Sequence, residues 1–189
     1  MDIKQITPVD VPGIAVVHIA SFPKDHITAH FSEKVLTLFL QKLISYEIYN
    51  IVASDSENRV AGYLIAGYNY RKALIHFVKE HYLTVIKILL FSPAFIPDKI
   101  KSFFLKKHKA DPVPIVNLDI IAVNPLIKNQ GIGSKLIEYF EGMLLRDNIR
   151  EYILYVKENN ESAIDFYKKR GFSIFGSNGS TLIMKKEIR

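Results

Sequence analysis

The sequence predicts a mixed α+β domain, on the basis of its length, its composition and the order of its hydrophobic patterns. Its 189 residues suffice for one domain with a full core, so we expect a single domain over residues 1–189. Hydrophobic residues make up 49% of the chain and charged residues 23%, which argues against a disordered, collagenous or coiled-coil protein. Helical and β-rich segments follow one another along this chain, as in a sheet covered by helices.

The composition also restricts the chemistry and the location. The chain contains no cysteine, which excludes disulfides, thiolate metal ligands and a cysteine nucleophile, and we expect no metal site. The first ten residues, MDIKQITPVD, carry charge in place of an apolar signal core, and no stretch reaches the ~18 apolar residues that span a bilayer. We therefore expect a cytoplasmic protein.

The positive charge is concentrated in one segment. The formal net charge is +6, but residues 71–110 contain nine Lys/Arg against two Asp/Glu, and the rest of the chain sixteen against seventeen. A nucleic-acid-binding protein would spread its basic residues over the surface that reads the nucleic acid, so we expect no nucleic-acid partner.

In the N-terminal third, hydrophobic periodicity predicts a strand, two helices and a hairpin of two further strands. We expect the strand at 3–6, the helices from Thr7 to about 20 and over 31–44, and the hairpin strands at 46–54 and 60–68. Thr7 can cap the first helix, with Pro8 and Asp10 in its first turn.

Residues 71–110 form a basic insertion with apolar residues at helical spacing and an expected break around Ser92, Pro93 and Pro97. One interpretation is a membrane-surface or acidic-partner patch. In that patch lysines would face phosphates and phenylalanines would insert: Lys87, Lys99, Lys101, Lys106, Lys107, Lys109, Phe91, Phe95, Phe103 and Phe104. The alternative, which we favour, is a helical insertion that packs on its own domain with solvated lysines.

The C-terminal half predicts a strand, a loop and a helix, followed by a second strand and helix and a final hairpin. The strands are expected at 115–123, 152–156, 173–175 and 181–188, with a five-residue turn at 176–180. The loop 124–133 leads into a helical pattern that includes Leu136 and Phe140, and Gly171 ends the second helix.

Two glycines stand at the start of the first of these helices. At Gly131 and Gly133 the missing side chains would let an anion approach backbone N–H groups at the positive end of a helix, where a diphosphate would fit. A turn can also require such glycines for its own geometry. The spacing matches neither GxGxxG nor GxxxxGK[ST].

A second segment gives this loop a context. Residues 160–172, NESAIDFYKKRGF, follow it by one strand, and the two segments together resemble the GNAT superfamily of acyl-CoA-dependent N-acyltransferases. That family has a strand, an [R/Q]xxGxG/A loop and helix, a strand, and NxxAxxFYxxxGF. The second pattern matches at every specified position, whereas Lys128 occupies the Arg or Gln position of the first.

The resemblance implies a fold and a set of ligand-binding positions. The fold is an α/β/α arrangement: a mixed, mostly antiparallel sheet of six to seven strands flanked by helices, here with a helical insertion between strands 3 and 4. The fourth and fifth strands should separate and leave room for the pantetheine arm of acetyl-CoA. This arm would lie along the stretch Ile121, Ala122 and Val123 and pair with the backbone of Ile121 and Val123. The pyrophosphate would lie against Lys128, Asn129, Gln130, Gly131, Ile132, Gly133 and Ser134.

The same resemblance suggests catalytic positions. Tyr167 would face the thioester sulfur as cofactor-binding residue and proton donor, or would only pack with Phe166. Asp119, a carboxylate within an apolar strand, is the candidate base, or a structural aspartate with its own partner. By strand alternation Asn117, Asp119 and Ile121 are expected on one face. Asn160 would cap the helix beside acetyl-CoA, with or without contacting it.

The predicted activity is acetyl transfer from acetyl-CoA, as co-substrate, to a primary amine of a small molecule. The insertion would shape the acceptor pocket or a homodimer contact, and its basic charge favours a neutral or anionic acceptor such as an amino sugar or sugar nucleotide. The alternatives are a non-catalytic CoA-binding module, an acetyltransferase for protein N-termini or lysines, and an adaptor that associates with membranes or acidic polymers through residues 71–110.

Overall fold

The computed structural model describes residues 1–22, 28, 31–91, 115–127 and 130–189, and for 88–91 it describes the backbone alone. Seven strands form one sheet in the order β1-β2-β3-β4-β5-β7-β6. β4 and β5 pair in parallel and the other neighbours pair antiparallel, which confirms the expected mixed, mostly antiparallel sheet. The strands are β1 (Asp2–Gln5), β2 (Tyr49–Ser54), β3 (Val60–Gly67), β4 (Val116–Val123), β5 (Glu151–Lys157), β6 (Ser173–Asn178) and β7 (Thr181–Glu187).

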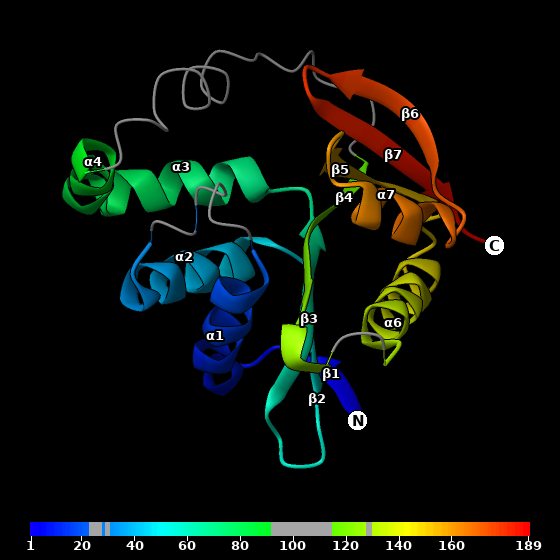
Figure 1. Cartoon of the computed structure of the whole chain (residues 1–189), viewed down its shortest axis with the longest axis horizontal. Coiled ribbons are helices and arrows are strands. Elements are labelled where there is room, and N and C mark those ends of the chain that lie inside the picture. The colour runs from blue at the N-terminus through cyan, green and yellow to red at the C-terminus, as the bar shows by residue number, and fades with distance from the viewer. Residues whose placement is uncertain (23–27, 29–30, 92–114, 128–129) are drawn as a thin grey trace.

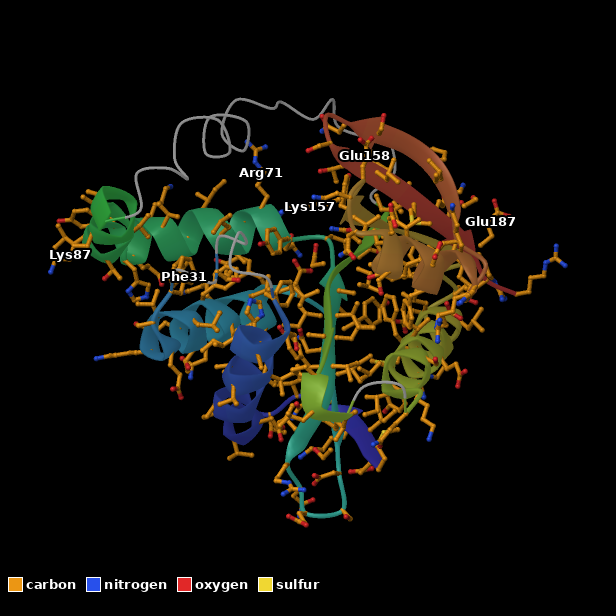
Figure 2. All side chains as sticks on the ribbon, viewed as in Figure 1. Phe31, Arg71, Lys87, Lys157, Glu158 and Glu187 are labelled. Atoms are coloured by element: carbon orange, nitrogen blue, oxygen red, sulfur yellow. The ribbon has the colours of Figure 1, made fainter. Side chains whose placement is uncertain are left out.

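Helices cover both faces of this sheet, which Figure 1 shows edge-on. One face carries α1 (Val11–Ser21), α2 (Glu33–Tyr46) and α3 (Tyr70–Glu80), and the other carries α6 (Ile132–Arg146) and α7 (Glu161–Lys168). Each face has its own hydrophobic cluster, and Figure 2 shows side chains filling the space on either side. Leu36 and Phe39 of α2 belong to one cluster, and Leu136 and Phe140 of α6 to the other. The predicted layered α+β fold is confirmed.

The N-terminal helices begin at polar caps, close to where the sequence places them. Thr7 and Asp10 form a capping box around the short 3₁₀ turn η1 (Pro8–Asp10), which leads directly into α1. The Ser32 side chain caps α2 by accepting a hydrogen bond from the N–H of Val35. Helical hydrogen bonding continues to the N–H of Glu47, so Tyr46 belongs to α2 and not, as expected, to the following strand.

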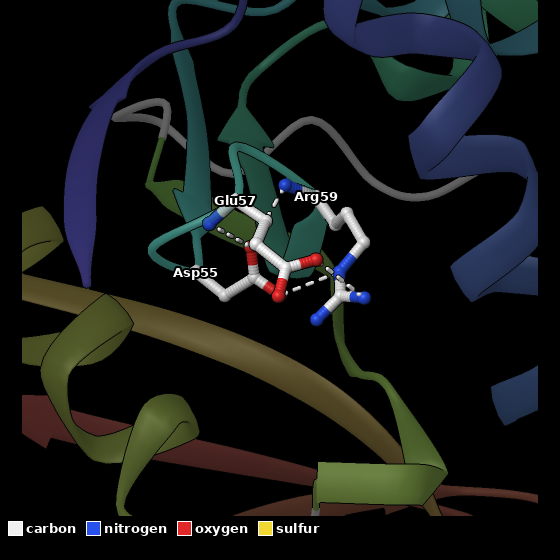
Figure 3. Close-up of polar contacts among 3 residues, drawn as sticks. All are labelled: Asp55, Glu57 and Arg59. Carbon is white, nitrogen blue, oxygen red and sulfur yellow. Dashed lines mark hydrogen bonds and ion pairs between the residues drawn. The ribbon is translucent and has the colours of Figure 1, made fainter.

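The hairpin of β2 and β3 closes through a polar turn, shown in Figure 3. Asp55 Oδ1 accepts hydrogen bonds of 2.9 Å from the backbone N–H groups of Glu57 and Arg59. The Arg59 guanidinium bridges both carboxylates, at 2.8 Å from Asp55 and 2.8 Å from Glu57. The hydrogen bond from the Arg59 backbone N–H is the largest of the interactions that lower the pKa of Asp55. Asn58 has a φ of 59°, which an asparagine adopts readily in a turn.

The insertion after β3 begins with α3, which packs on the domain as we expected. Ala73 and Phe77 are buried against α2, and the Phe77 ring lies against those of Phe31 and Phe39. α3 ends at Glu80, and α4 (Tyr82–Phe91) follows after His81; the expected break around 92–97 lies outside the described residues. Lys87 lies in the middle of α4 and points away from the sheet (Figure 2).

The remaining residues of the predicted basic patch lie outside the described part of the chain: Ser92, Pro93, Phe95, Pro97, Lys99, Lys101, Phe103, Phe104, Lys106, Lys107 and Lys109, together with the side chain of Phe91. Of the helices that the structure describes, none is long and apolar enough to cross a membrane.

The final hairpin is tighter than the sequence suggests. β6 continues to Asn178, which pairs with Thr181, so the turn consists of Gly179, with a φ of 61°, and Ser180. Gly176 was expected in the turn but belongs to β6. The pairing of β6 with β7 shifts in register between Ile174 and Gly176, which accommodates one extra residue in β6.

Candidate active site

The parallel strands β4 and β5 separate partway along their length. They pair at Val116–Tyr152, Asn117–Ile153 and Leu118–Leu154, whereas β4 continues to Val123 and β5 to Lys157. Beyond Leu118, the β4 edge that faces β5 therefore has no strand partner among the described residues. Such an edge carries backbone donors and acceptors with the spacing of a strand.

Backbone direction determines which residues present these groups. The N–H of Asn124 donates to Ala61 O of β3 at 2.8 Å, and the N–H and C=O of successive residues alternate between the two edges of a strand. Ala122 therefore faces β3, while Ile121 and Val123 face the separation. The Val123 carbonyl already accepts a hydrogen bond from Ser21 Oγ at 2.9 Å, at the end of α1.

A β-bulge lies where the two strands part. Ile65 of β3 pairs with Ile120, but Ala66 pairs with Leu118, so Asp119 is the extra residue. The bulge contradicts the expectation that Ile121 shares a face with Asp119. The bulge shifts by one residue the alternation of side chains between the two faces of β4. Ile120 therefore packs in the hydrophobic cluster under α1, α2 and α3 (the α1–α3 cluster), and Ile121 packs against the cluster under α6 and α7 (the α6–α7 cluster).

Asn117 and Asp119 do lie together, with Asn117 Nδ2 donating a hydrogen bond to Asp119 Oδ1. Asp119 Oδ2 and Asn117 Oδ1 are buried and have no hydrogen-bond partner in the described part of the chain. Burial, and then the negative charge of Glu47, raise the pKa of Asp119 to about 9, against a smaller lowering by Asn117. Asp119 is therefore mostly protonated at neutral pH.

Glu47 is the second carboxyl group of this cluster. Only 5% of it is exposed, and its Oε1 accepts a hydrogen bond of 2.8 Å from the N–H of Asn69, ahead of α3. Burial raises the pKa of Glu47, although its bonds to the backbone of Asn69 and Tyr68 oppose this. The charge of Asp119 in turn adds to the effect of burial in raising the pKa of Tyr70 in α3. Asp119 therefore belongs to the face that α2 and α3 cover.

The N-terminus of α6 lies in the predicted pyrophosphate loop. Its first intrahelical hydrogen bond runs from Lys135 N to Gly131 O at 3.0 Å, which leaves the N–H groups of Ile132, Gly133 and Ser134 without a helical acceptor. No side chain of the described residues caps this end. The predicted site residues Lys128 and Asn129 lie outside the described part, and Gln130 directly precedes the helix.

The two glycines of the loop serve different purposes. Gly131 has a φ of 73°, and a Cβ placed there would meet no atom of the described residues within 4 Å. A Cβ on Gly133 would lie 3.1 Å from Phe166 Cζ, so this glycine is needed for packing against α7. That both glycines admit an anion stays a prediction, and at Gly133 the missing side chain also allows a side chain of α7 to approach.

Arg170 reaches from the end of α7 to the first turn of α6. Its guanidinium carbon lies 3.6 Å from the centroid of the Phe166 ring, and its Nη1 donates to Phe166 O at 2.9 Å. Its Nη2 donates to Ser134 Oγ. The Nε atom is buried and has no acceptor among the described residues.

α7 supplies the remaining predicted site residues. Asn160 caps the helix, its Oδ1 accepting from the N–H of Ala163 at 3.2 Å, which confirms its role as a cap. Tyr167 is 8% exposed, with ring centroids 5.3 Å from those of Phe166 and Phe172. Burial raises the pKa of Tyr167 to about 12, so the phenol keeps its proton throughout the physiological range.

The two predicted catalytic side chains belong to opposite faces of the sheet. Tyr167 packs in the α6–α7 cluster with Leu118, whereas Asp119 interacts with Glu47 and Tyr70 on the other face. The separation of β4 from β5 begins between Leu118 and Asp119, and so lies between the two groups. A reacting centre in the separation would have a carboxyl group on one side and a phenol on the other.

Nothing in the local sequence pattern indicates three contributors to this site. Glu47 was placed within a predicted strand, Ser21 was the last polar residue before Pro23, and Arg170 occupies an unspecified position of the NxxAxxFYxxxGF pattern. Among the described residues there is no group of three or more His, Asp or Glu side chains arranged to hold a metal ion.

Comparison with known proteins assigns the chain to a family. Residues 18–172 match the acetyltransferase (GNAT) family. A spermidine N(1)-acetyltransferase of Thermoplasma acidophilum is 27% identical over 132 residues, which cover 70% of this chain and 78% of that protein. An uncharacterized Bacillus subtilis protein, YxbD, is 36% identical over 56 residues, which cover 30% of this chain and only 35% of that protein.

Solved structures share the fold. The PaiA N-acetyltransferase of Thermoplasma acidophilum, crystallised with coenzyme A, superimposes with a TM-score of 0.60 at 16% identity, covering 98% of both chains. The family match extends over most of the chain and includes both the separated strands and the uncapped helix. The chain therefore belongs to the GNAT acetyltransferase family and is an acyltransferase of that type.

Proposed function

We propose that this protein transfers an acetyl group from acetyl-CoA directly to a primary amine of a small molecule. The observation that carries the proposal is the separation of β4 from β5 beside the uncapped N-terminus of α6. A pantetheine arm has amide groups that need partners once they leave water, and a free strand edge supplies them. A diphosphate needs N–H donors and positive charge, and a helix N-terminus supplies both.

The described residues fit such a ligand. The backbone groups of Ile121 and Val123 face the separation. Because the Val123 carbonyl already accepts a hydrogen bond from Ser21, the Val123 N–H is the group of that residue left for pantetheine. At the left-handed backbone of Gly131 no atom of the described residues would meet a Cβ, which leaves an anion room to approach the first turn of α6. When bound, acetyl-CoA supplies the activated thioester.

The proposed reaction joins the two faces of the sheet. The amine nitrogen, after losing a proton to ionised Asp119, attacks the thioester carbonyl carbon; a C–N bond forms and the C–S bond breaks. Tyr167 donates its proton to the leaving sulfur and recovers one from the acetylated nitrogen. With a pKa of about 12, Tyr167 is a far weaker acid than a thiol of pKa ~8.5, so the return of the proton must accompany the donation.

The test is calorimetry with CoA and acetyl-CoA, followed by an assay of thiol release with a panel of amines. Saturable binding and amine-dependent release above hydrolysis support the proposal. Binding without turnover on any amine would identify a non-catalytic CoA-binding module, and turnover only on peptides or proteins would identify an acetyltransferase for N-termini or lysines. If neither CoA nor acetyl-CoA binds, the proposed function is overturned.

The class of acceptor has two candidates. The basic insertion favours a neutral or anionic amine such as an amino sugar or sugar nucleotide. Against this, Asp119 and Glu47 lie on the face of the sheet that carries α3, where the insertion begins, and a relative is named a spermidine N(1)-acetyltransferase. Buried acceptor oxygens suit the ammonium groups of a polyamine. A panel that compares spermidine, a monoamine of equal length and glucosamine 6-phosphate distinguishes the two, by which of them has the highest kcat/KM.

A further inference from the structure

Arg170 is a partly buried cation with no anionic partner in the described part of the chain. None of the ion pairs within the described residues includes it, and its Nε has no acceptor there. Buried guanidinium groups are usually paired with a carboxylate or phosphate, because an uncompensated charge in a partly dry environment is unfavourable. The described residues therefore hold this side chain in place without supplying a counter-charge.

Packing fixes the guanidinium beside the first turn of α6. Phe166 lies between Arg170 and the position of Gly133: its ring stacks under the guanidinium at 3.6 Å and approaches the Gly133 backbone closely. The bond from Nη1 to Phe166 O holds the side chain in this orientation. The positive charge thus lies beside the same helix end whose first N–H groups have no acceptor among the residues that the structure describes.

The bond to Ser134 has a further consequence for that hydroxyl. A serine hydroxyl has one proton to donate and lone pairs to accept with. Because Ser134 Oγ accepts from Arg170 Nη2, its own proton stays available, and no described residue accepts it. An anion at the start of α6 would be such an acceptor.

We infer that Arg170 is a positioning residue for the diphosphate of acetyl-CoA: it orients the Ser134 hydroxyl toward the phosphate oxygens and adds a positive charge beside them. The inference rests on the proposed function, since it assigns a role within the same site. Lysine cannot reproduce the arrangement fully, because a guanidinium donates to Ser134 and Phe166 at once from a planar fork that also stacks on the ring.

The test compares ligands with and without the diphosphate. The Kd for CoA is measured by calorimetry, and kcat/KM is measured for acetyl-CoA and for S-acetylpantetheine, which lacks the diphosphate. For R170Q we expect CoA to bind about ten- to a hundredfold more weakly, since hydrogen bonds to charged groups have effects of that size. Turnover of S-acetylpantetheine should stay within about twofold of wild type, which also shows that the variant is folded.

Matched variants separate charge from position. K169Q removes the same charge from the neighbouring exposed side chain, and should leave the Kd for CoA nearly unchanged. R170K should recover part of the affinity at low salt and lose it as salt increases. S134A should weaken CoA binding, and the double variant R170Q/S134A should lose less than the product of the two single effects.

Three results would overturn the inference. One is equal CoA affinity in wild type, K169Q and R170Q. A second is an equal loss with S-acetylpantetheine, which would mean that Arg170 only supports the packing of α7. A third is independence of the Arg170 and Ser134 effects. If wild-type protein does not bind CoA at all, the proposed function fails, and this inference fails with it for that separate reason.

Discussion

Tyr167 has a ring that packs in the core and a hydroxyl that the proposed reaction uses. Tyr167→Phe keeps the ring contacts with Phe166 and Phe172 and removes only the proton donor. We expect kcat to fall by about 10²-fold or more, as for other general acids, with the Kd for acetyl-CoA nearly unchanged. Steady-state kinetics and calorimetry on the same preparation measure the two effects.

Tyr139→Phe is the matched control. It makes the same chemical change on the partly exposed outer side of α6, and should leave kcat at the wild-type value. If Tyr167→Phe retains full kcat, the phenol is a packing residue and the sulfur takes its proton from elsewhere.

Asp119 can accept a proton only when it is ionised, and with a pKa of about 9 that form is a small fraction at neutral pH. We therefore expect kcat/KM to rise with pH toward about 9. Asp119→Asn should lower kcat/KM at alkaline pH and remove this part of the rise. The amine acceptor titrates in the same range, so the pH–rate profiles of the two proteins must be compared with one acceptor.

Glu47 provides an independent check of that assignment. Its negative charge is the second cause of the raised pKa of Asp119, after burial. Glu47→Gln should therefore shift the alkaline rise to lower pH, because one source of repulsion is removed. If the pH–rate profiles of Asp119→Asn and Glu47→Gln both coincide with that of the wild type, the Asp119 carboxyl group is not the base.

At the scale of elements, the start of α6 depends on its fit against α7. A Cβ on Gly133 would press on Phe166, which is itself held under Arg170. Gly133→Ala should therefore lower the free energy of unfolding by about 1–3 kcal/mol relative to the matched change Gly142→Ala. Gly142 lies on the exposed side of the same helix with nothing within 4 Å of a Cβ, so alanine there should stabilise by about 0.5–1 kcal/mol.

Urea unfolding of the two variants measures the difference. Gly133→Ala should also weaken CoA binding, because Phe166 and Arg170 must shift, whereas Gly142→Ala should not. Equal stability of the two variants would mean that Phe166 moves freely, and that the helix end is less rigid than its contacts suggest.

Elements with a regular hydrophobic period were predictable, and their local irregularities were not. The strand at 115–123 and the helix that follows it have clear periods of two and 3.6 residues, and both appear in the structure. The bulge at Asp119 interrupts that strand without any glycine or proline to signal it. It arises from the register with β3, which is a relation between distant segments.

At the scale of the whole molecule, Asp119 makes stability depend on pH. Its pKa is raised in the folded state, so its contribution to stability is complete below the unfolded value of ~4 and is lost as pH rises toward about 9. Asp119→Asn removes the charge without changing the shape, and its new amide N–H₂ could donate to the unpartnered Asn117 Oδ1. We expect the variant to melt a few degrees above wild type at alkaline pH, on the order of 2–6 °C.

This difference should shrink as the pH falls toward the unfolded pKa, where wild-type Asp119 is protonated in both states. Thermal melts of both proteins across the pH range, in the absence of ligand, provide the measurement. A constant difference at all pH values would point to altered packing, and would contradict the raised pKa.

The sequence by itself determined the order of the elements, the class of fold and the family, because these follow from hydrophobic period and from the local patterns around the α6 loop and α7. It also located Gly131, Tyr167 and Asp119 as candidates. Only the tertiary structure placed Tyr167 and Asp119 on opposite faces of the sheet, brought Glu47 to Asp119, and set Arg170 against Ser134. Those contacts join residues 36 or more positions apart, and such contacts depend on strand register and helix packing, which no local pattern specifies.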